Sequence, residues 1–330
     1  MSIIVTGSLA YDYLMSFPGR FKDHILPEKI ENVSLSFLVD SMRKQRGGCA
    51  SNIAYNLALL GERPRIMATA GMDFCDYREW LEGKGVDTSG IVEIEGEFTA
   101  SFFASTDLDN NQIASFYTGA MSYAHQLSFR DVPREEITLA VISPNDPRAM
   151  VKYVAECQEL GIPYLYDPSQ QIIRLEGADL IAGAQGAEVF VVNDYEFGMV
   201  CRKTGLSRGD LLRLAKVTII TKGERGSTIV PRDAEPISIP AVPPRRLVDP
   251  TGVGDAYRAG VLKGFLCEYP WEVAGRMGSL AATYVLEEHG TQNHAYTLEQ
   301  FVWRFREVFG PRPEVEALLE SAEGSSLAAK

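Results

Sequence analysis

The sequence is short of cysteine, histidine and long apolar runs, and each shortage excludes a class of protein. Its five cysteines are odd in number and contain no C-x-x-C pair, so they predict neither a disulfide framework nor a zinc site. The four histidines show no metal-ligand spacing. No apolar run reaches about 18 residues, so no membrane-spanning helix is expected. These absences, and a start that runs directly into Ile3-Ile4-Val5 without a charged leader, predict a cytoplasmic protein.

Positive charge is also scarce. Lysine and arginine number 32 against 44 aspartates and glutamates, which gives a formal net charge of −12. Nucleic-acid binding depends on neutralising phosphates with basic side chains, so no nucleic-acid partner is expected. An acidic chain also fits poorly with an anionic membrane surface. A small anionic ligand is still compatible, because backbone N–H groups can bind phosphate on an acidic protein.

Two common nucleotide-binding signatures are missing as well. The chain has no G-x-x-x-x-G-K-[ST] sequence, which excludes a Walker A site. Its glycine-rich turn near Gly252 fails the dinucleotide fingerprint, because Tyr257 stands where the third glycine belongs and no strand leads directly into the turn. Any nucleotide bound by this chain is therefore held by another arrangement.

The chain does contain enough apolar sequence for a large core, 45% of 330 residues. Short apolar runs alternate with amphipathic helical patterns, and this order predicts a mostly parallel sheet with helices on both faces and ligands at the carboxyl ends of its strands. We expect one domain over residues 1–310 and a tail over residues 311–330, a short helical piece followed by a loosely ordered end. The predicted strands are residues 2–6, 65–70, 139–143, 164–166, 189–192, 217–221 and 227–230, and the predicted helices include residues 49–60, 147–160 and 206–215.

Two segments, residues 9–46 and 97–120, break this alternation. Within them, residues 33–39, 99–105 and 112–116 have the pattern of strands but no helices of their own. We expect these strands to form a small antiparallel sheet that projects from the body as a lid and can cover a cleft.

The most informative motif is the glycine-rich turn at residues 249–260, D-P-T-G-V-G-D-A-Y-R-A-G. Gly252 and Gly254 let backbone N–H groups point toward one place, and the helix predicted over residues 256–266 adds the positive end of its dipole. Such a site suits a polyphosphate. Asp255 cannot itself bind an anion, but it can take a proton from an attacking hydroxyl. The alternative is an ordinary turn in which Asp255 caps the helix.

Two weaker motifs precede it. The pair Gly47-Gly48 opens an amphipathic helix and permits close approach of a ligand, while Asn52 offers both a donor and an acceptor. Asp12 follows the first strand, with Ser8 before it, and its carboxylate could accept hydrogen bonds from two vicinal hydroxyls of a sugar. The alternatives are an ordinary helix start and a solvated loop carboxylate.

Two further motifs follow buried strands. Asn193 and Glu196 lie just after the strand at 189–192, where polar side chains suit contacts with phosphate and with Mg²⁺ through water. The segment T-K-G-E-R-G at residues 221–226 either contributes to the same site or is only a hairpin turn between two strands.

In this order, the motifs resemble the ribokinase-like (PfkB) family of sugar and nucleoside kinases, over about residues 2–310. The family commonly has D-T-x-G-x-G-D in the late motif, and here Pro250 replaces the first threonine. With Val253, that change looks like the bacterial adenosine kinase branch of the family. Several loops are similar to that branch too, and they include residues 17–21, 34–40, 112–117, 167–171 and 290–292. The fold implied is a three-layer α/β sandwich with a mostly parallel central sheet, plus the lid.

The resemblance implies an ATP-dependent transfer to the 5′-hydroxyl of adenosine, which gives AMP and ADP in purine salvage. Asp255 would be the base, and the N–H groups of Gly252, Val253 and Gly254 would form the anion hole. The resemblance implies further roles. The ribose would be held by Ser8, Asp12, Gly48 and Asn52, and the purine would lie between Phe102 and Phe116, with Gln170 or Gln171 at its edge. ATP would contact Asn193, Glu196, Thr221, Lys222, Gly223 and Gly226. Glu196 would hold Mg²⁺ through water, and Asp249 and Thr251 would help to hold K⁺.

Three alternatives stay open. A sugar kinase of the same family, of the ribokinase or fructokinase type, would share the late motif and the lid. A kinase of broader purine nucleoside specificity would share the aromatic pair as well. A nucleoside-binding protein without activity could keep the fold. A homodimer through the exposed lid strands is expected by analogy, since unpaired strand edges favour pairing.

Overall fold

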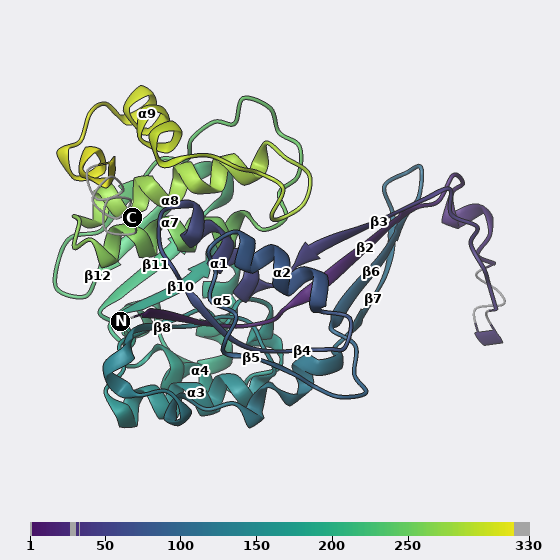
Figure 1. Cartoon of the computed structure of the whole chain (residues 1–330), viewed down its shortest axis with the longest axis horizontal. Helices are drawn as coiled ribbons and strands as arrows, with labels where there is room; N and C mark the ends of the chain where they lie inside the picture. Colours follow the sequence, from purple (N-terminus) through teal and green to yellow (C-terminus); the bar gives the residue numbers. More distant parts are fainter. Residues whose placement is uncertain (1, 27–30, 33, 320–330) are drawn as a thin grey trace.

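The centre of the body is a nine-stranded sheet, shown in the computed structural model of Figure 1, which describes residues 2–26, 31–32 and 34–319. Its strands are β1 (Ser2–Thr6), β4 (Arg65–Ala70), β5 (Ile91–Glu93), β8 (Ile137–Ile142), β9 (Tyr164–Tyr166), β10 (Val189–Asn193), β11 (Val217–Thr221), β12 (Ser227–Pro231) and β13 (Ile237–Ile239). They lie in the order β13-β12-β11-β10-β9-β8-β1-β4-β5. The pairings from β5 to β11 are parallel, and those of β12 and β13 are antiparallel. The predicted mostly parallel sheet is confirmed.

Helices cover both faces of this sheet, so the body has three layers. Alternate residues of β1 show this division, because Ile3 and Val5 pack in one apolar cluster and Ile4 packs in another. The helices of the first face are α1 (Cys49–Leu59), α2 (Cys75–Gly83) and α7 (Val253–Leu266), with α8 (Trp271–Leu286) packed on α7 and α9 (Leu298–Phe309) on α8. The helices of the other face are α3 (Pro147–Leu160), α4 (Gly177–Ala184), α5 (Asp194–Thr204) and α6 (Arg208–Leu212).

A second sheet extends away from the body (Figure 1). Its strands, in spatial order, are β3 (Ser41–Gly47), β2 (Ala10–Ser16), β6 (Ala100–Thr106) and β7 (Gln112–Tyr117). The two outer pairings are antiparallel, while the central pairing of β2 with β6 is parallel. This lid sheet lies where the sequence predicts it, and strands β6 and β7 begin within one residue of the predicted ones.

The prediction of a strand over residues 33–39 is wrong. Val33 lies outside the described residues, and residues 34–39 form no strand. Of their apolar side chains, Phe37 packs edge-on against Phe17 and Phe21, with ring centroids 5.0 and 4.9 Å apart, whereas Leu35 and Leu38 are exposed. The partner of β2 is instead Ser41–Gly47, which is the polar sequence S-M-R-K-Q-R-G.

One predicted helix is shorter in the structure, whereas the helical piece predicted at the start of the tail is present. The helix predicted over residues 206–215 is shorter, because α6 begins after the cap Ser207 and spans only Arg208–Leu212. In the tail, residues 313–319 are helical, and Val315 and Leu318 are buried against the apolar cluster of α8 and α9. Residues 320–330, the predicted loose end, lie outside the described residues.

The structure also bears on the expectations about membrane-spanning helices and disulfides. Within residues 2–26, 31–32 and 34–319, no helix combines the length and apolarity needed to cross a membrane. All five cysteines are free thiols, namely Cys49, Cys75, Cys157, Cys201 and Cys267.

Candidate active site

Several predicted site residues lie at one edge of the main sheet, where its parallel strands end. Ser8 follows β1 by two residues, and Asp167, for which no role was predicted, directly follows β9. Asn193 and Thr221 end β10 and β11 and are paired in register. Helix α7 carries Asp255 in its first turn. Parallel topology thus gathers residues from distant parts of the chain at the position where α/β proteins bind ligands.

Helix α7 begins in the glycine-rich turn. Gly252 caps it with a φ of 81°, a left-handed conformation that L side chains rarely adopt. A Cβ at this position would also lie 2.9 Å from the side chain of Thr291. Of the predicted anion-hole donors, Val253 and Gly254 lie in the first turn, where an α-helix offers their N–H groups no acceptor, and the N–H of Val253 makes only a long contact of 3.5 Å with the carbonyl oxygen of Pro250. This position suits the anion hole predicted from Gly252, Val253 and Gly254, and that role stays a prediction.

Asp255 is 8% exposed, and both of its carboxylate oxygens face polar side chains. Oδ2 accepts a hydrogen bond from Asn52 Nδ2 at 2.8 Å, and Oδ1 lies 3.6 Å from Arg258 Nη1. Burial raises the pKa of Asp255, while Arg258 and Asn52 oppose this rise. A buried carboxylate with a raised pKa, at the start of a helix, is suited to accept a proton from a bound hydroxyl.

A buried chain of hydrogen bonds holds Asn52 in turn. Gln292 Nε2 donates to Asn52 Oδ1 and to Tyr77 Oη, each at 2.7 Å, and Tyr77 Oη donates to the carbonyl oxygen of Gly47 at 3.0 Å. Because Asn52 Oδ1 accepts from Gln292, the amide presents its NH₂ group to Asp255. Asn52 therefore orients the Asp255 carboxylate, in addition to the ribose role that the resemblance implies.

Gly48 and Ser8 join α1 to the end of β1. Gly48 has a φ of 101°, and a Cβ there would lie 2.5 Å from the carbonyl oxygen of Ser8. Ser8 Oγ accepts a hydrogen bond from the N–H of Cys49 at 3.0 Å, and its carbonyl accepts one from Ala50 at 3.1 Å. Both residues thus have a structural role at the start of α1, and the Ser8 hydroxyl keeps its proton for donation to a ligand.

The register of the lid sheet places three candidates on one face. Asp12 pairs with Phe102 across β2 and β6, and Phe102 pairs with Phe116 across β6 and β7. Paired residues point to the same side of a sheet. Asp12 Oδ2 lies 2.7 Å from the point where a Cβ on Gly47 would be. Burial, and then the nearby charge of Asp249, raises the pKa of Asp12 to about 6. Gln45, the partner of Asp12 across β2 and β3, lies 2.6 Å from the point where a Cβ on Gly290 would be, so this face of the lid lies beside the loop that Asp249 holds.

The two phenylalanines lie side by side as cross-strand neighbours. Phe102 is half-buried and Phe116 is 50% exposed. On the opposite face of the lid, Phe103 stacks on Tyr13 with ring centroids 4.8 Å apart. Phe102 and Phe116 therefore form one aromatic platform within this chain, whereas the resemblance implies rings on the two sides of a purine.

The two glutamine candidates differ in burial. Both lie in the 3₁₀ helix η6 (Ser169–Ile173), where Gln170 is exposed and Gln171 is 7% exposed. Gln171 Oε1 has no hydrogen-bond partner within the described part of the chain. A buried acceptor without a partner is costly, so Gln171 is the better placed of the two to bind a ligand.

The N-x-x-E motif is a capping box at the start of α5. The N–H of Glu196 donates to Asn193 Oδ1, and the N–H of Asn193 donates to Glu196 Oε2, each at 2.8 Å. Glu196 Oε1 accepts a hydrogen bond from Ser169 Oγ at 3.3 Å, which joins this motif to η6. Both oxygens of Glu196 thus have protein partners, and this arrangement fits contact with Mg²⁺ through water better than direct coordination.

The T-K-G-E-R-G segment forms the tight connection between β11 and β12. Gly223 and Gly226 have φ values of 59° and 78°, and a Cβ on Gly226 would lie 2.0 Å from the carbonyl oxygen of Ile239. Lys222 Nζ donates to Thr228 Oγ1 at 2.6 Å. The turn between two strands, one of the two interpretations from sequence, is confirmed, and a role in binding ATP stays a prediction.

Asp249 fixes the loop in front of α7. Its oxygens accept hydrogen bonds from the N–H groups of Thr251 at 2.9 Å and Gly290 at 3.0 Å. Burial opposes the ionisation of Asp249, but these donors outweigh it and lower its pKa. No group of three or more His, Cys, Asp or Glu side chains with metal-binding geometry occurs in the described ranges. A K⁺ ion beside Asp249 and Thr251 would therefore depend on carbonyl oxygens, and that site stays a prediction.

Sequence analysis missed the buried partners of Asp255. Arg258, Gln292 and Asp167 lie within the segments 249–260, 290–292 and 167–171 that resemble the family, but the sequence predicted no role for any of them. Arg258 Nε lies 2.6 Å from Asp167 Oδ2. Cys49 is close to the same cluster, since burial and then Asp255 raise the pKa of its thiol. The signal available in sequence was a charged residue within a helix whose other residues are mostly apolar.

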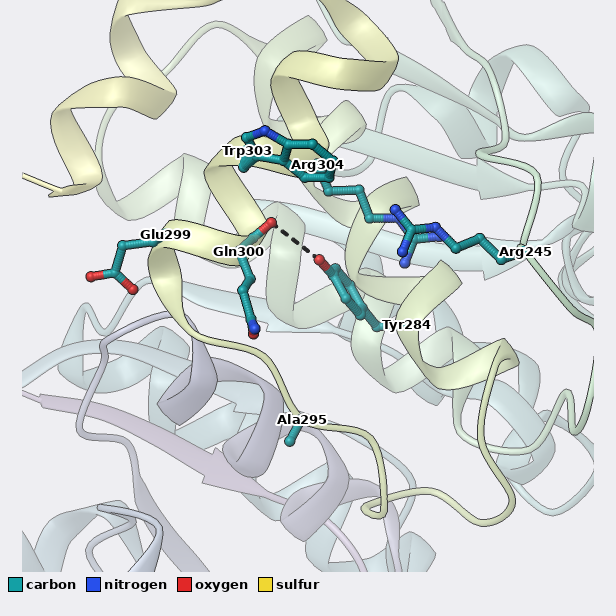
Figure 2. A pocket seen from close by; sticks show the side chains of 7 residues that line it. All are labelled: Arg245, Tyr284, Ala295, Glu299, Gln300, Trp303 and Arg304. Atoms are coloured by element: carbon teal, nitrogen blue, oxygen red, sulfur yellow. Dashed lines mark hydrogen bonds between the residues drawn. The ribbon is translucent and has the colours of Figure 1, made fainter.

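A hollow of about 580 Å³ between α8 and α9 lies apart from these residues (Figure 2). Its lining contains none of the predicted site residues and consists of Arg245, Tyr284, Ala295, Glu299, Gln300, Trp303 and Arg304. Arg304 is already paired with Glu287 through two contacts of 2.8 and 2.6 Å. The chemistry of the glycine-rich turn is thus not located in this hollow.

Comparisons with known proteins find nucleoside kinases that are similar to this chain over most of its length. The chain is 30% identical to a nucleoside kinase of Methanothermobacter thermautotrophicus, over 95% of this chain and 98% of that protein. A solved structure of a Burkholderia thailandensis nucleoside kinase in complex with inosine is similar, with a TM-score of 0.84, 39% identity, and coverage of 94% and 99% of the two chains. The nucleoside kinase of Methanocaldococcus jannaschii, described as an archaeal member of the ribokinase family, gives a TM-score of 0.82 at 28% identity, with coverage of 93% and 99%.

The family assignment rests on most of the chain. The model of the pfkB family of carbohydrate kinases matches residues 9–298, which include the lid, the Gly48 and Asn52 motif and the glycine-rich turn. The predicted ribokinase-like fold, a helix-flanked and mostly parallel sheet with a small lid sheet, is confirmed by these neighbours. The chain belongs to the pfkB family of carbohydrate kinases.

Proposed function

We propose that this protein is a nucleoside kinase that transfers the γ-phosphoryl group of ATP to the 5′-hydroxyl of a purine nucleoside. The observation that carries the proposal is the position of Asp255, buried in the first turn of α7, where backbone N–H groups have no intrahelical acceptor, and oriented by Asn52 at 2.8 Å. The similar kinases named above support the acceptor class, because one of them is described in complex with inosine. A further structure of that kinase is described in complex with ADP and inosine, which supports ATP as donor.

In the proposed reaction, Asp255 accepts the proton of the 5′-hydroxyl while the 5′-oxygen of the nucleoside attacks the γ-phosphorus in line. The bond from that phosphorus to the bridging oxygen breaks, and ADP leaves with the electron pair. The N–H groups of Gly252, Val253 and Gly254 stabilise the charge on the transferred group. Mg²⁺, held through water at Glu196, would neutralise phosphate charge. Closure of the lid would exclude water, which otherwise competes as the acceptor.

Within this class we propose adenosine as the preferred acceptor. Support comes from the loops that resemble the adenosine kinase branch and from the shared face of Asp12, Phe102 and Phe116. A carboxylate suits the 2′- and 3′-hydroxyls, and an aromatic platform suits a purine, since free sugars offer no π face. A purine nucleoside kinase of broader specificity fits the same residues, and a substrate panel separates the two.

The test is a coupled assay of ADP release with Mg²⁺-ATP and a panel of acceptors. We expect turnover with adenosine to exceed that with inosine and guanosine, and no turnover with free ribose or fructose. Comparable rates with all three nucleosides would establish the broader specificity. Turnover with ribose or fructose alone would replace the proposal with a sugar kinase, and ADP release with none of them would indicate a binding protein.

The aromatic platform gives a prediction about binding. Phe102→Ala and Phe116→Ala should each weaken adenosine binding by about 5- to 150-fold, because stacking on an aromatic ring contributes about 1–3 kcal/mol per base. ATP binding should change little, since neither residue lies near the turn at Gly223 and Gly226. Isothermal titration with each ligand measures both affinities.

Phe103→Ala is the matched control, because it removes the same side chain from the neighbouring position on the opposite face of the lid. We expect it to leave adenosine affinity within about twofold of the unmodified protein. Equal losses for Phe102→Ala and Phe103→Ala would assign the effect to lid stability and place the purine elsewhere.

We also propose that the protein forms a homodimer through the lid. The lid face opposite Asp12 exposes Met42, Ile113 and Tyr117 at 62%, 44% and 43%, and β3 and β7 are the outer strands of the lid sheet, with no further strand paired to them among the described residues. Sedimentation velocity should give a dimer for the unmodified protein and a monomer for Met42→Lys combined with Ile113→Lys. A monomer in both cases would disprove the proposal.

A further inference from the structure

Arg258 is a buried cation one helical turn after Asp255. It is 8% exposed, and its position at i+3 on α7 places it on the same side of the helix as the carboxylate. Its guanidinium reaches back toward the start of the helix, because a Cβ on Gly254 would lie 2.6 Å from Arg258 Nη1. Gly254 has ordinary backbone torsion, so the space for this guanidinium is a reason for glycine here.

A cation at this place needs compensation. The start of a helix carries the positive end of its dipole, which disfavours a nearby guanidinium. Burial adds the cost of removing the charge from water, and it would lower the pKa of Arg258 if the carboxylates of Asp167 and Asp255 did not more than offset it. The arginine is therefore stabilised by these two carboxylates rather than by its position on the helix.

The two carboxylates hold the guanidinium unequally. Arg258 Nε lies 2.6 Å from Asp167 Oδ2, whereas Arg258 Nη1 lies 3.6 Å from Asp255 Oδ1. The first is a close ion pair, and the second exceeds hydrogen-bond distance. Asp167 is fully buried, and its oxygens have no hydrogen-bond donor in the described residues besides this ionic contact. The guanidinium therefore lies closer to Asp167 than to Asp255 Oδ1, the oxygen that does not accept a hydrogen bond from Asn52.

We propose that Arg258 is a positioning residue that keeps Asp255 ionised and aimed at the acceptor, while its anchor Asp167 prevents it from occupying Asp255 Oδ1. Asn52 binds Oδ2, so Oδ1 is the oxygen that receives the proton. A direct pair between Arg258 and Oδ1 would block that oxygen and make the carboxylate a weaker base. The inference rests on the proposed function, in which Asp255 is the general base.

Other charges around this cluster also bear on its titration. Cys49 on α1 faces Asp255, Asp167 and Arg258. Glu196 on α5 faces Asp167, and burial raises the pKa of Asp167 to about 7 although Arg258 opposes this rise. On the lid side, Asp12 and Asp249 face each other. Arg258 is the only basic side chain among these groups, so its removal should shift the balance toward protonated carboxylates.

The experiment measures single-turnover formation of nucleoside monophosphate between about pH 5 and 9, with Mg²⁺-ATP and the best acceptor of the panel. Arg258→Gln removes the charge that favours ionised Asp255, so its acid limb should move to higher pH by about one unit or more. Asp167→Asn leaves the whole guanidinium charge to Asp255, so its acid limb should move to lower pH while its plateau rate falls. ATP titrates identically in every reaction, and differences between variants report the protein.

Opposite shifts of the two acid limbs support the proposal, because loss of packing alone would not separate them by sign. Shifts in the same direction, or a rate that falls with an unchanged profile in both variants, would overturn it. If Arg258→Gln alone had a lower rate with an unchanged pH profile, Arg258 would be assigned to contact with the transferred phosphoryl group, and its positioning role would be overturned. Should Arg258→Gln fail to fold, Asp167→Asn decides, since an unmoved acid limb there also overturns the proposal.

Arg304→Gln is the matched control. Arg304 is 5% exposed and paired with Glu287, but it lies on α9, away from Asp255. We expect this variant to lose stability and to keep the pH profile of the unmodified protein. If the unmodified protein phosphorylates no nucleoside, the proposed function fails, whereas an active enzyme with identical profiles in all variants disproves only the role of Arg258.

Discussion

Replacing Asp255 with Asn is expected to lower the single-turnover rate of nucleoside phosphorylation by about 10²–10⁴-fold, the range typical of a general base. Asparagine has the same shape and can accept the hydrogen bond of Asn52, but it cannot take a proton. The change removes a buried carboxylate and with it the cost of its desolvation, while Arg258 keeps its closer ion pair with Asp167, so the protein should still fold. Adenosine affinity, measured by titration calorimetry, should stay within about threefold because Asp12 and the aromatic platform are unchanged.

Glu156→Gln is a suitable control for this substitution. Glu156 is a buried carboxylate on α3, 4% exposed, which accepts hydrogen bonds from Ser128 Oγ at 2.7 Å and from the N–H of Phe129 at 2.8 Å. It is removed from the glycine-rich turn, so its neutral variant should lose stability and keep its turnover. Near-normal turnover in Asp255→Asn would remove this carboxylate from the chemistry and leave its burial without a catalytic reason.

The body of the fold could be predicted because its strands carry a strong local signal. Strand β10 is the apolar run V-F-V-V before Asn193, buried on both faces, and its neighbours have the same character. The lid strand β3 carries no such signal, since five of its seven residues are polar or charged and it is exposed at most positions. In the segment predicted as that strand, Phe37 contacts other aromatic rings while Leu35 and Leu38 are exposed, and sequence alone cannot distinguish such an arrangement from backbone pairing.

The candidate site shows the same division between local and distant information. Gly252, Asp255 and Asn52 stand in motifs whose chemistry follows from neighbouring residues. The partners that fix these groups come from other segments, because Asp167 follows β9 and Gln292 lies in the loop after α8. Their contacts depend on how the layers pack, and no spacing in the sequence encodes that packing. The capping box of Asn193 and Glu196 is the converse case, a local structure that sequence analysis interpreted only as a ligand site.

The anion hole leads to the second large effect. Gly252→Ala should lower the rate of phosphoryl transfer by about 10²–10³-fold, which is the contribution typical of one oxyanion-hole donor. Alanine disfavours the φ of 81°, and its Cβ would lie 2.9 Å from Thr291, so the turn must shift and its N–H groups must lose their common direction.

Gly186→Ala separates strain from catalysis in this prediction. Gly186 has a nearly equal φ of 79°, but no atom lies within 4 Å of the position of its Cβ. Both variants should lose about 1 kcal/mol or more of unfolding free energy, because both force alanine into a left-handed conformation. Only Gly252→Ala should lose single-turnover rate, while its affinity for adenosine stays close to normal. Equal rates in the two variants would mean that the start of α7 does not stabilise the transferred group, and the phosphoryl site would then have to lie elsewhere along the edge of the sheet.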